Sequence, residues 1–225
     1  APGLLAAGGV LDAPTLVAAY SRGIFPWYSS GQPILWWSTD PRMVLPPTEF
    51  RLHRSLRKTI QKLLNTQRLE LRIDHDFERV ILACAQTPRD GQSGTWILPA
   101  MVQAYTRLHR VGMAHSVETW IDGELAGGLY VVNLGAMVFG ESMFSRRSDA
   151  SKIALAGLMA LCRRHGITLV DCQQNTAHLA SMGGRLMPRA PFVQHVRLAL
   201  LQPAPRWEFR PVYWREHLSI GDERV

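Results

Sequence analysis

Asp171 and Gln173 are the first residues in this sequence whose types and spacing suit chemistry. They stand two apart at the end of a strand predicted over residues 169–172, so both side chains should point to one side and Cys172 to the other. A carboxylate beside an amide makes a fixed hydrogen-bonding pair that can orient a reacting group. The alternative is a capping role for the next helix, which Asn175 can fill unaided.

Glu141 is a second candidate, at the end of a strand predicted to begin at Met137. A single acid where a strand meets a loop is usually solvated, which is the alternative to a role in a site. The residues that follow, from Met143 to Ser145, could line an apolar pocket with the start of the helix at Ser151, or belong to the core.

Trp27 and Trp96 lie in glycine-rich loops, within residues 23–38 and 89–97. An aromatic side chain in such a loop most often packs against the protein. A platform on which an unpaired nucleotide stacks has the same requirements, so both interpretations stay open.

Positive charge is concentrated in a helix predicted over residues 51–62, where Leu52, Leu56 and Ile60 recur at helical spacing. Almost no acid precedes Glu70, so we expect the remaining face to contact phosphates, with a solvated face as the alternative. The expected contacts are Arg51, Arg54, Arg57, Lys58 and Lys62.

Composition sets broad limits. The 225 residues are 47% hydrophobic, enough for a core in one or two domains. Lys and Arg number 25 against 18 Asp and Glu, a net charge of +7 that favours a polyanionic partner, although a basic composition can also serve solubility alone. Cys84, Cys162 and Cys172 lack CxxC spacing, so neither disulfides nor zinc is expected and a reducing cytoplasm fits best. We expect no membrane anchor or signal peptide, because no run approaches ~20 apolar residues.

The elements that must position these residues change in character near residue 67, where we place a domain boundary between 1–66 and 67–225. The first part contains a helix over 13–20 and an aromatic loop that leads into short strands. In the second part we expect the following elements: a strand at 68–73, helices at 76–85 and 99–110, a hairpin of 116–120 and 125–132 extended by 137–141, a helix at 150–164, a strand at 169–172, and helices at 175–182 and 191–201. The tail beyond Pro203 is expected to be extended. This order indicates an α+β sheet domain such as the acyltransferase fold of N-acetyltransferases.

Missing motifs narrow the chemistry. The sequence has no GxSxG, Walker lysine, HExxH or Rossmann fingerprint, which disfavours the common hydrolases, kinases, zinc proteases and dehydrogenases. A coenzyme A acetyltransferase of this fold would carry a glycine-rich pyrophosphate loop before the helix at 150. Residues 144–152 contain no glycine.

Six segments resemble motifs of the leucyl/phenylalanyl-tRNA protein transferase family, and the resemblance covers nearly the whole chain. They are GIFPWY (23–28), PILWWS (33–38), DPR (40–42), GTWI (94–97), GESMFS (140–145) and DCQ (171–173). The resemblance implies a bacterial cytoplasmic enzyme that moves Leu, Phe or less readily Met from aminoacyl-tRNA to the N-terminal amine of proteins that begin with Arg or Lys, marking them for degradation. It implies neither metal nor coenzyme, and we expect a monomer.

The resemblance also implies roles for individual residues. Trp27 and Trp96 match positions that hold the terminal adenosine of the tRNA. Glu141, Asp171 and Gln173 match the catalytic and peptide-binding group. The amino-acid pocket would be lined by Leu129, Met143, Leu155 and Leu158. Two pocket positions that are aromatic in some members correspond to Leu158 and Cys162 here, which leaves the balance between Leu and Phe donors open.

The expected chemistry is attack of a neutral amine on an ester that is already activated, so positioning can supply much of the acceleration. We expect Asp171 to orient Gln173, whose side-chain oxygen accepts a hydrogen bond from the amine, and Glu141 to offer negative charge to the cationic acceptor. An amide is too weak a base to take the proton, which a ribose hydroxyl or water would relay.

Two other functions are compatible with the sequence. One is a small-molecule N-acetyltransferase that uses acetyl-CoA, and the other is a noncatalytic RNA-binding module.

Overall fold

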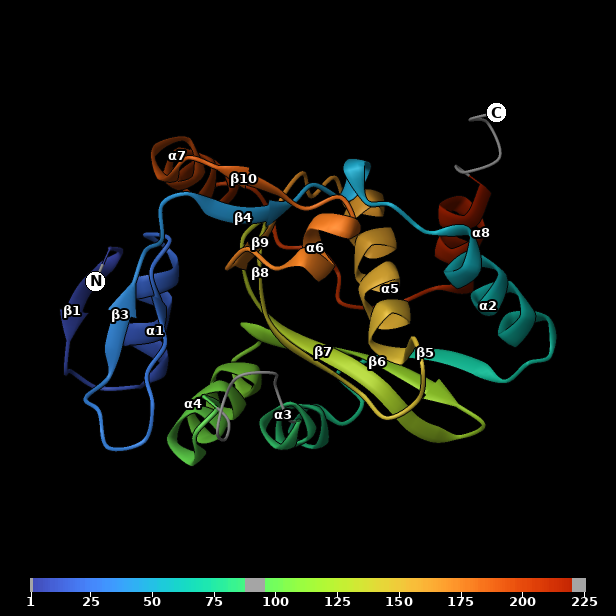
Figure 1. Cartoon of the computed structure of the whole chain (residues 1–225), viewed down its shortest axis with the longest axis horizontal. Helices are drawn as coiled ribbons and strands as arrows, with labels where there is room; N and C mark the ends of the chain where they lie inside the picture. The colour runs from blue at the N-terminus through green and yellow to red at the C-terminus, as the bar shows by residue number, and fades with distance from the viewer. Residues whose placement is uncertain (1, 88–95, 220–225) are drawn as a thin grey trace.

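The computed structural model describes residues 2–87 and 96–219, which form a small sheet and a large one (Figure 1). The small sheet has the order β1-β3-β2, and the large sheet has the order β10-β4-β9-β8-β7-β6-β5. The strands are β1 (Leu4–Ala7), β2 (Phe25–Pro26), β3 (Leu35–Trp37), β4 (Arg42–Leu45), β5 (Leu69–Ile73), β6 (Ala114–Ile121), β7 (Glu124–Leu134), β8 (Met137–Ser145), β9 (Val170–Gln173) and β10 (Arg185–Met187).

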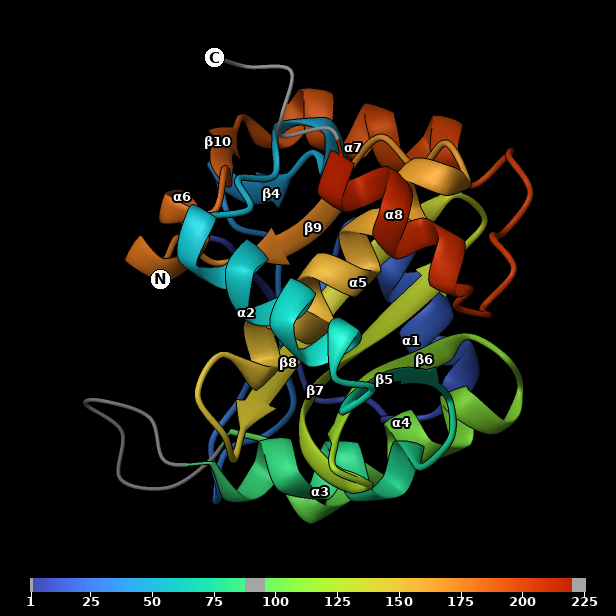
Figure 2. The ribbon, with the colours of Figure 1, turned by 90° about the vertical axis from the view of Figure 1, so that its right-hand side faces the viewer.

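Helices cover both faces of the large sheet, with α3 and α4 on one face and α5 on the other (Figures 1 and 2). They are α1 (Ala13–Tyr20), the 3-10 helix η1 (Pro47–Glu49), α2 (Arg54–Asn65), α3 (Phe77–Gln86), α4 (Pro99–Arg110), α5 (Ala150–Arg164), α6 (Ala177–Ser181), α7 (Arg189–Ala199) and α8 (Pro211–Ser219). The mixture of helices with a largely antiparallel sheet confirms the predicted α+β class.

Strand alternation divides the interior into two cores. On β7, Tyr130 and Val132 face the core that contains α1, α3 and α4, whereas Leu129 and Val131 face the core that contains α2, α5 and α8. Each face of this strand therefore buries its own set of side chains, and any site at the middle of the sheet lies between two packed layers.

The hairpin of β6 and β7 forms where the Asp-Gly pair predicts it. Asp122 and Gly123 both have positive φ, 57° and 77°, and Ile121 pairs with Glu124. Two left-handed residues match the twist of an antiparallel pair, which explains why Asp-Gly is favoured here.

β8 and β9 are parallel and separate after a short contact. Their pairing comprises Val138 with Val170 and Phe139 with Asp171, while β8 continues to Ser145. On its other edge β8 shows a register shift against β7 between Tyr130 and Val131. A bulge increases local twist, so the strands diverge and open a space between them.

The first 66 residues contribute to both sheets. β4 pairs with β9 and β10, so it lies inside the large sheet. Residues 2–37 supply the small sheet and α1, which joins the core around α3 and α4.

Three predicted elements differ in ways that matter for the site or the core. The strand predicted at 137–141 extends to Ser145, so Glu141 lies inside β8 rather than at its end. The prediction that the whole tail beyond Pro203 is extended was wrong, because α8 begins at Pro211 and buries Trp214 and Leu218 on the α5 side of the sheet. The basic helix starts at Arg54 rather than at 51, since the chain first forms η1 and His53 takes the N-cap position.

Candidate active site

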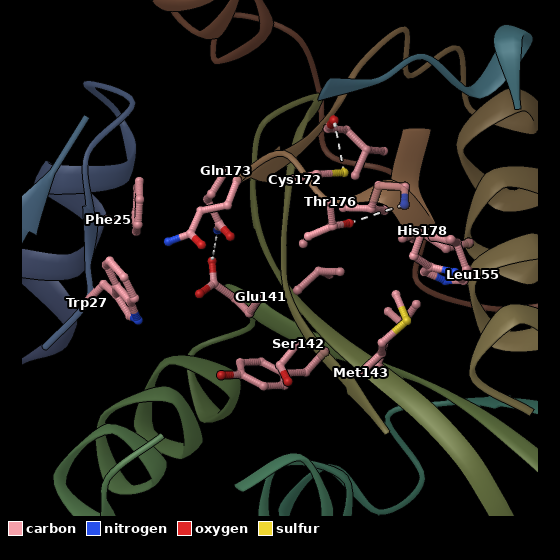
Figure 3. Close-up of a pocket in the computed structure, with 18 of the residues that line it drawn as sticks. Phe25, Trp27, Glu141, Ser142, Met143, Leu155, Cys172, Gln173, Thr176 and His178 are labelled. Carbon is pink, nitrogen blue, oxygen red and sulfur yellow. Dashed lines mark hydrogen bonds between the residues drawn. The ribbon is translucent and has the colours of Figure 1, made fainter. Parts of the chain in front are cut away.

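A cavity of about 660 Å³ lies where β8 and β9 separate (Figure 3). Its lining includes eight of the residues that the sequence singles out: Trp27, Trp96, Leu129, Glu141, Met143, Leu155, Leu158 and Gln173. Asp171 and the basic residues of α2 do not line it. The structure thus brings together one aromatic, one polar and one apolar group of side chains.

The elements explain how these side chains converge. The register shift leaves Glu141 without a partner in β7, and the consecutive residues 140–143 of β8 all line the opening. Gln173 ends β9 on the other side of it. Leu155 and Leu158 are three apart on α5, so they share a helix face. Trp27 reaches the cavity from the loop after β2.

Glu141 is the centre of a buried hydrogen-bond network. Its Oε1 accepts from the Tyr20 hydroxyl at 2.7 Å and from Gln173 Nε2 at 2.9 Å, and its Oε2 accepts from the Tyr105 hydroxyl at 3.2 Å. The two tyrosine hydroxyls are 2.5 Å apart. We call Tyr20, Tyr105, Glu141 and Gln173 the polar wall; α1, α4, β8 and β9 each supply one member.

Burial controls the charge of this wall. Desolvation raises the pKa of Glu141 to about 7, although the hydrogen bonds from Tyr20, Tyr105 and Gln173 favour the ionised form. Burial also raises the pKa values of Tyr20 and Tyr105 well above their ordinary value, so both hydroxyls stay protonated as donors. Glu141 is therefore a carboxyl group whose protonation changes near neutral pH.

Asp171 lies behind the cavity. Its two carboxylate oxygens accept from Arg42 Nε at 2.8 Å and Nη2 at 2.7 Å, and neither side chain is exposed to solvent. Asp171 Oδ1 also accepts from the backbone N–H of Gln173 at 2.9 Å. A carboxylate held in this way can orient its neighbour but does not contact a molecule in the cavity.

Gln173 ends β9 in an unusual backbone conformation. Its φ of 55° places it in the left-handed region, which residues with a side chain seldom adopt. Cys172 packs against the core on the α5 side, whereas Asp171 bonds to Arg42 and Gln173 bonds to Glu141 on the other side, in agreement with the predicted alternation. Cys172 and Gln173 line the cavity and Asp171 does not. Because Gln173 Nε2 donates to Glu141, the side-chain oxygen of Gln173 lies on the other side of its amide group.

The apolar part of the cavity is formed by β7, β8 and α5. We call it the apolar slot and define it by the predicted residues Leu129, Met143, Leu155 and Leu158. Val170 and Cys172 from β9 also contribute. Cys162 is fully buried in the α5 core and is absent from the lining, so it does not shape the slot directly. Desolvation raises the pKa of the Cys172 thiol, which makes this side chain a neutral part of the surface.

The aromatic end comes from the small sheet and from the residue that follows the undescribed segment 88–95. Trp27 is half-buried with its ring centre 5.7 Å from that of Trp37, whose Nε1 donates to Trp27 O at 2.7 Å. Phe25 and Trp96 lie on the same cavity. Of the predicted loop 89–97, residues 89–95 lie outside the described part of the chain.

The basic residues of α2 lie beside the cavity wall but not in it. Arg51 N–H donates to Met182 O at 2.9 Å, and His53 Nε2 lies 3.1 Å from Ser181 O, so the start of α2 lies against the end of α6. Arg54, Lys58 and Lys62 are exposed. Arg57 is half-buried and donates through Nη1 to Leu218 O at 2.7 Å, which ties α2 to α8.

The start of α5 is where coenzyme A would be bound in an acetyltransferase of this fold. The N–H groups of Ala150 and Ser151 donate to Arg147 O at 3.1 Å and to Ser145 Oγ at 3.3 Å. A pyrophosphate needs such amides to be available. The geometry therefore disfavours the acetyl-CoA interpretation at this helix end.

Sequence reasoning missed several residues that the structure places at the site. Tyr20 and Tyr105 looked like core positions, and their helical spacing gives no sign of a hydrogen bond to Glu141. Arg42 appeared only as part of the DPR motif. Thr176 and His178 line the cavity from the α6 end, and Thr176, not Asn175, caps that helix by accepting from Leu179 N.

A largely antiparallel sheet that opens between two parallel strands, with an apolar slot beside orienting polar groups, suits an acyl-transfer enzyme. Sequence models of a leucyl/phenylalanyl-tRNA protein transferase and of its N-terminal domain match residues 44–197 and 9–40. The chain belongs to the leucyl/phenylalanyl-tRNA protein transferase family and is an aminoacyltransferase.

Sequence relatives are close to this chain, and the solved structures that resemble it are distant. Leucyl/phenylalanyl-tRNA--protein transferases from a Polaromonas species and from Leptothrix cholodnii are 61% and 59% identical over 97% and 99% of this chain, and the match covers 86% of each relative. Among solved structures, FemX shares 12% identity at a TM-score of 0.47, over 81% of this chain and 70% of that one. A GCN5-related N-acetyltransferase from Kribbella flavida shares 11% identity at a TM-score of 0.34, over 78% and 61%.

Residues 2–87 and 96–219 lack membrane-spanning helices and clustered metal ligands. None of the helices in these ranges has the length and apolar character required to cross a membrane. The same ranges contain no group of three or more His, Cys, Asp or Glu side chains placed to hold a metal ion.

Proposed function

We propose that this aminoacyltransferase moves leucine or phenylalanine, and methionine less readily, from charged tRNA to the N-terminal amine of proteins that begin with Arg or Lys. The observation that carries the proposal is the single cavity in which the apolar slot meets the polar wall. The slot suits an apolar side chain that is not branched at Cβ. The polar wall suits the amine that attacks the ester carbonyl of the donor. The names of the relatives specify the same donors.

The slot would select the donor by shape. Leu129, Leu155 and Leu158 are apolar and nearly buried, and Met143 is a flexible thioether that can adapt to Leu, Phe or Met. A β-branched side chain such as Ile would place a methyl group next to the ester carbonyl, where a side chain that branches at Cγ places none. Discrimination of this kind is usually worth about 1–3 kcal/mol per methylene.

Gln173 would place the nucleophile. Its side-chain oxygen, turned away from Glu141, can accept a hydrogen bond from the attacking amine and align the nitrogen lone pair with the ester carbonyl. The new amide bond forms as the bond to the ribose 3′ oxygen breaks. That oxygen takes up a proton, which the amine releases through the ribose hydroxyl or a water.

Glu141 would supply negative charge to the acceptor. It is the acidic residue of the described lining, and a cationic N-terminal residue in the cavity would favour its ionised form. Asp171 would act on Gln173 through the backbone, because its carboxylate is already paired with Arg42. Trp27 and Trp96 would hold the terminal adenosine of the tRNA by stacking.

The tRNA body would lie along α2, with phosphates near Arg51, Arg54, Lys58 and Lys62. Arg57 would contribute as well, although its Nη1 also donates to Leu218 O in α8. Changing Lys58 and Lys62 to Gln should flatten the dependence of tRNA affinity on salt by about 0.7–0.9 per charge removed, because fewer counterions are released. Arg197→Gln on α7 is the control for each of the two single substitutions, because it also removes one charge. An unchanged salt slope would show that α2 is a solvated face.

The proposal extends to the setting of the reaction. The enzyme would work as a monomer in the bacterial cytoplasm, without metal or coenzyme, and its products would be marked for degradation.

One assay tests the transfer. Radiolabelled leucyl-tRNA, phenylalanyl-tRNA and isoleucyl-tRNA are each mixed with an Arg-initiated peptide and a Gly-initiated control. We expect label in the Arg peptide from the first two donors and little from the third. Equal labelling of both peptides would contradict acceptor selection, and absence of labelling would contradict the transfer itself.

A further inference from the structure

We propose that Arg42 and Thr39 are positioning residues, which hold Gln173 in the cavity wall through its backbone. The inference rests on the proposed function, because it concerns how the residue that receives the amine is kept in place. Both residues belong to the segment that runs from the small sheet into β4, and neither lines the cavity.

The first contact acts on the N–H of Gln173. Arg42 holds the two oxygens of Asp171 with two short hydrogen bonds, and Asp171 Oδ1 accepts the N–H of Gln173. A bidentate Arg–carboxylate pair fixes the plane of the carboxylate as well as its distance. The orientation of Asp171, and through it that of the Gln173 backbone, is therefore set by Arg42.

The second contact acts on the other backbone polar group of the same residue. Thr39 Oγ1 donates to Gln173 O at 3.2 Å. Gln173 is thus held at its N–H by Asp171, which Arg42 orients, and at its C=O by Thr39. A left-handed backbone at a residue with a side chain persists only when its surroundings impose it. These two contacts supply that constraint.

Arg42 also supports the aromatic side of the cavity. Its guanidinium carbon lies 4.7 Å from the ring centre of Phe25 and 4.7 Å from that of Phe192. Phe25 lines the cavity from β2. A flat guanidinium can stack between two rings while it pairs with a carboxylate, and an ammonium cannot do both. One side chain therefore links the polar wall to the small sheet.

Stability alone gives a weak reason for such an arrangement. Removing two charges from water is costly, and a buried ion pair is often no more stabilising than apolar residues of similar volume. A positioning role explains why Arg42 and Asp171 are paired in the interior, which a gain in folding stability does not explain.

The test is a set of double-mutant cycles with Gln173→Ala, read by single-turnover transfer of leucine from leucyl-tRNA to an Arg-initiated peptide. Thr39→Val removes one hydrogen bond and should slow transfer about fivefold. Arg42→Lys should slow it about 100-fold, as a misplaced reacting group does. In the Gln173→Ala background neither Thr39→Val nor Arg42→Lys should slow transfer further, because the side-chain amide that they position is already absent. The Kd for leucyl-tRNA should stay constant throughout.

Thr119→Val is the matched control, because Thr119 Oγ1 donates to the backbone oxygen of Ala150 at 2.9 Å away from the cavity lining. It should leave the transfer rate unchanged. If Arg42→Lys does not fold, the Thr39→Val cycle decides. Effects of Thr39→Val that multiply with Gln173→Ala, or that Thr119→Val reproduces, would overturn the inference while leaving the function intact. A wild-type protein that transfers no leucine would instead remove the function on which the inference rests.

Discussion

The polar wall and the apolar slot hold their side chains in opposite ways. Each member of the polar wall has a named hydrogen-bond partner within the wall, and Glu141 has three. The slot residues Leu129, Met143, Leu155 and Leu158 are held by packing, with no directional contact required. Removing one partner of a buried hydrogen bond leaves a desolvated group unpaired, whereas a change of shape in an apolar surface is partly absorbed by its neighbours.

The contrast separates two tasks of one cavity. Orientation of the amine depends on a rigid network, and choice of the donor depends on a surface that can adapt. We therefore expect substitutions in the polar wall to lower the rate with every donor, and substitutions in the slot to change the ratio between donors.

The largest effect is expected for Gln173→Ala. Without the side-chain oxygen the amine is no longer aligned, and the single-turnover rate should fall about 100-fold with leucyl-tRNA and phenylalanyl-tRNA alike. Quench-flow with labelled donor measures this rate. A fall in rate with only one of the two donors would contradict the division between polar wall and apolar slot, because Gln173 would then take part in donor selection.

The next effect concerns pH. The wild-type kcat/KM for an Arg-initiated peptide should rise with pH through about 7, because ionised Glu141 is the form that attracts the cation. In Glu141→Gln that step should disappear, leaving the titration of the acceptor amine near ~7.7–8.0, with a loss of about tenfold at the plateau. A pH profile identical in both proteins would exclude this role.

The same carboxyl predicts an opposite trend for stability. Its folded pKa of about 7 lies above the ordinary value of 4.5, so the folded state binds the extra proton between these values. The stability contributed by Glu141 is therefore present at low pH and lost as pH rises towards 7. Thermal melts of wild type and Glu141→Gln should converge at low pH and diverge as pH rises.

A smaller effect is expected in the slot. Leu158→Phe fills space that the donor side chain uses and should lower the use of phenylalanyl-tRNA relative to leucyl-tRNA about tenfold. Competition between the two labelled donors measures the ratio. If both donors lose equally, Leu158 supports the polar wall rather than the slot.

The smallest effect is expected for Met143→Leu. The two side chains have similar volumes, so the free energy of unfolding should change by less than about 1.5 kcal/mol and transfer of leucine should persist. Tyr105→Phe removes a single hydroxyl and is the matched change in the polar wall. It should slow transfer more than Met143→Leu does, and the reverse order would remove the distinction between the two regions.

Much of the fold follows from local patterns. The hairpin around Asp122-Gly123 and the amphipathic helices depend on neighbours in sequence, and both are confirmed. The cavity also collects the predicted Trp27, Glu141, Gln173 and slot residues. The roles assigned to them stay predictions.

What could not be predicted depends on contacts between distant residues. Arg42 reads as one residue of a short strand, because its partner Asp171 lies more than a hundred positions away. The left-handed backbone of Gln173 is held by contacts with Thr39 and Asp171, and no local pattern in the sequence indicates it. Tyr20 and Tyr105 obey the helical pattern of a core residue, and only the fold reveals that their hydroxyls meet at Glu141.

The order of strands in the large sheet bears on how the chain is made. β4 emerges early in synthesis, but its two neighbours β9 and β10 emerge only after β5 to β8 and α5. Pairing between segments so far apart closes a long loop, which is a slow step in folding. Until it closes, β4 presents two bare edges that can pair with other chains. A nascent chain that stalls before Met187 would therefore be prone to aggregation.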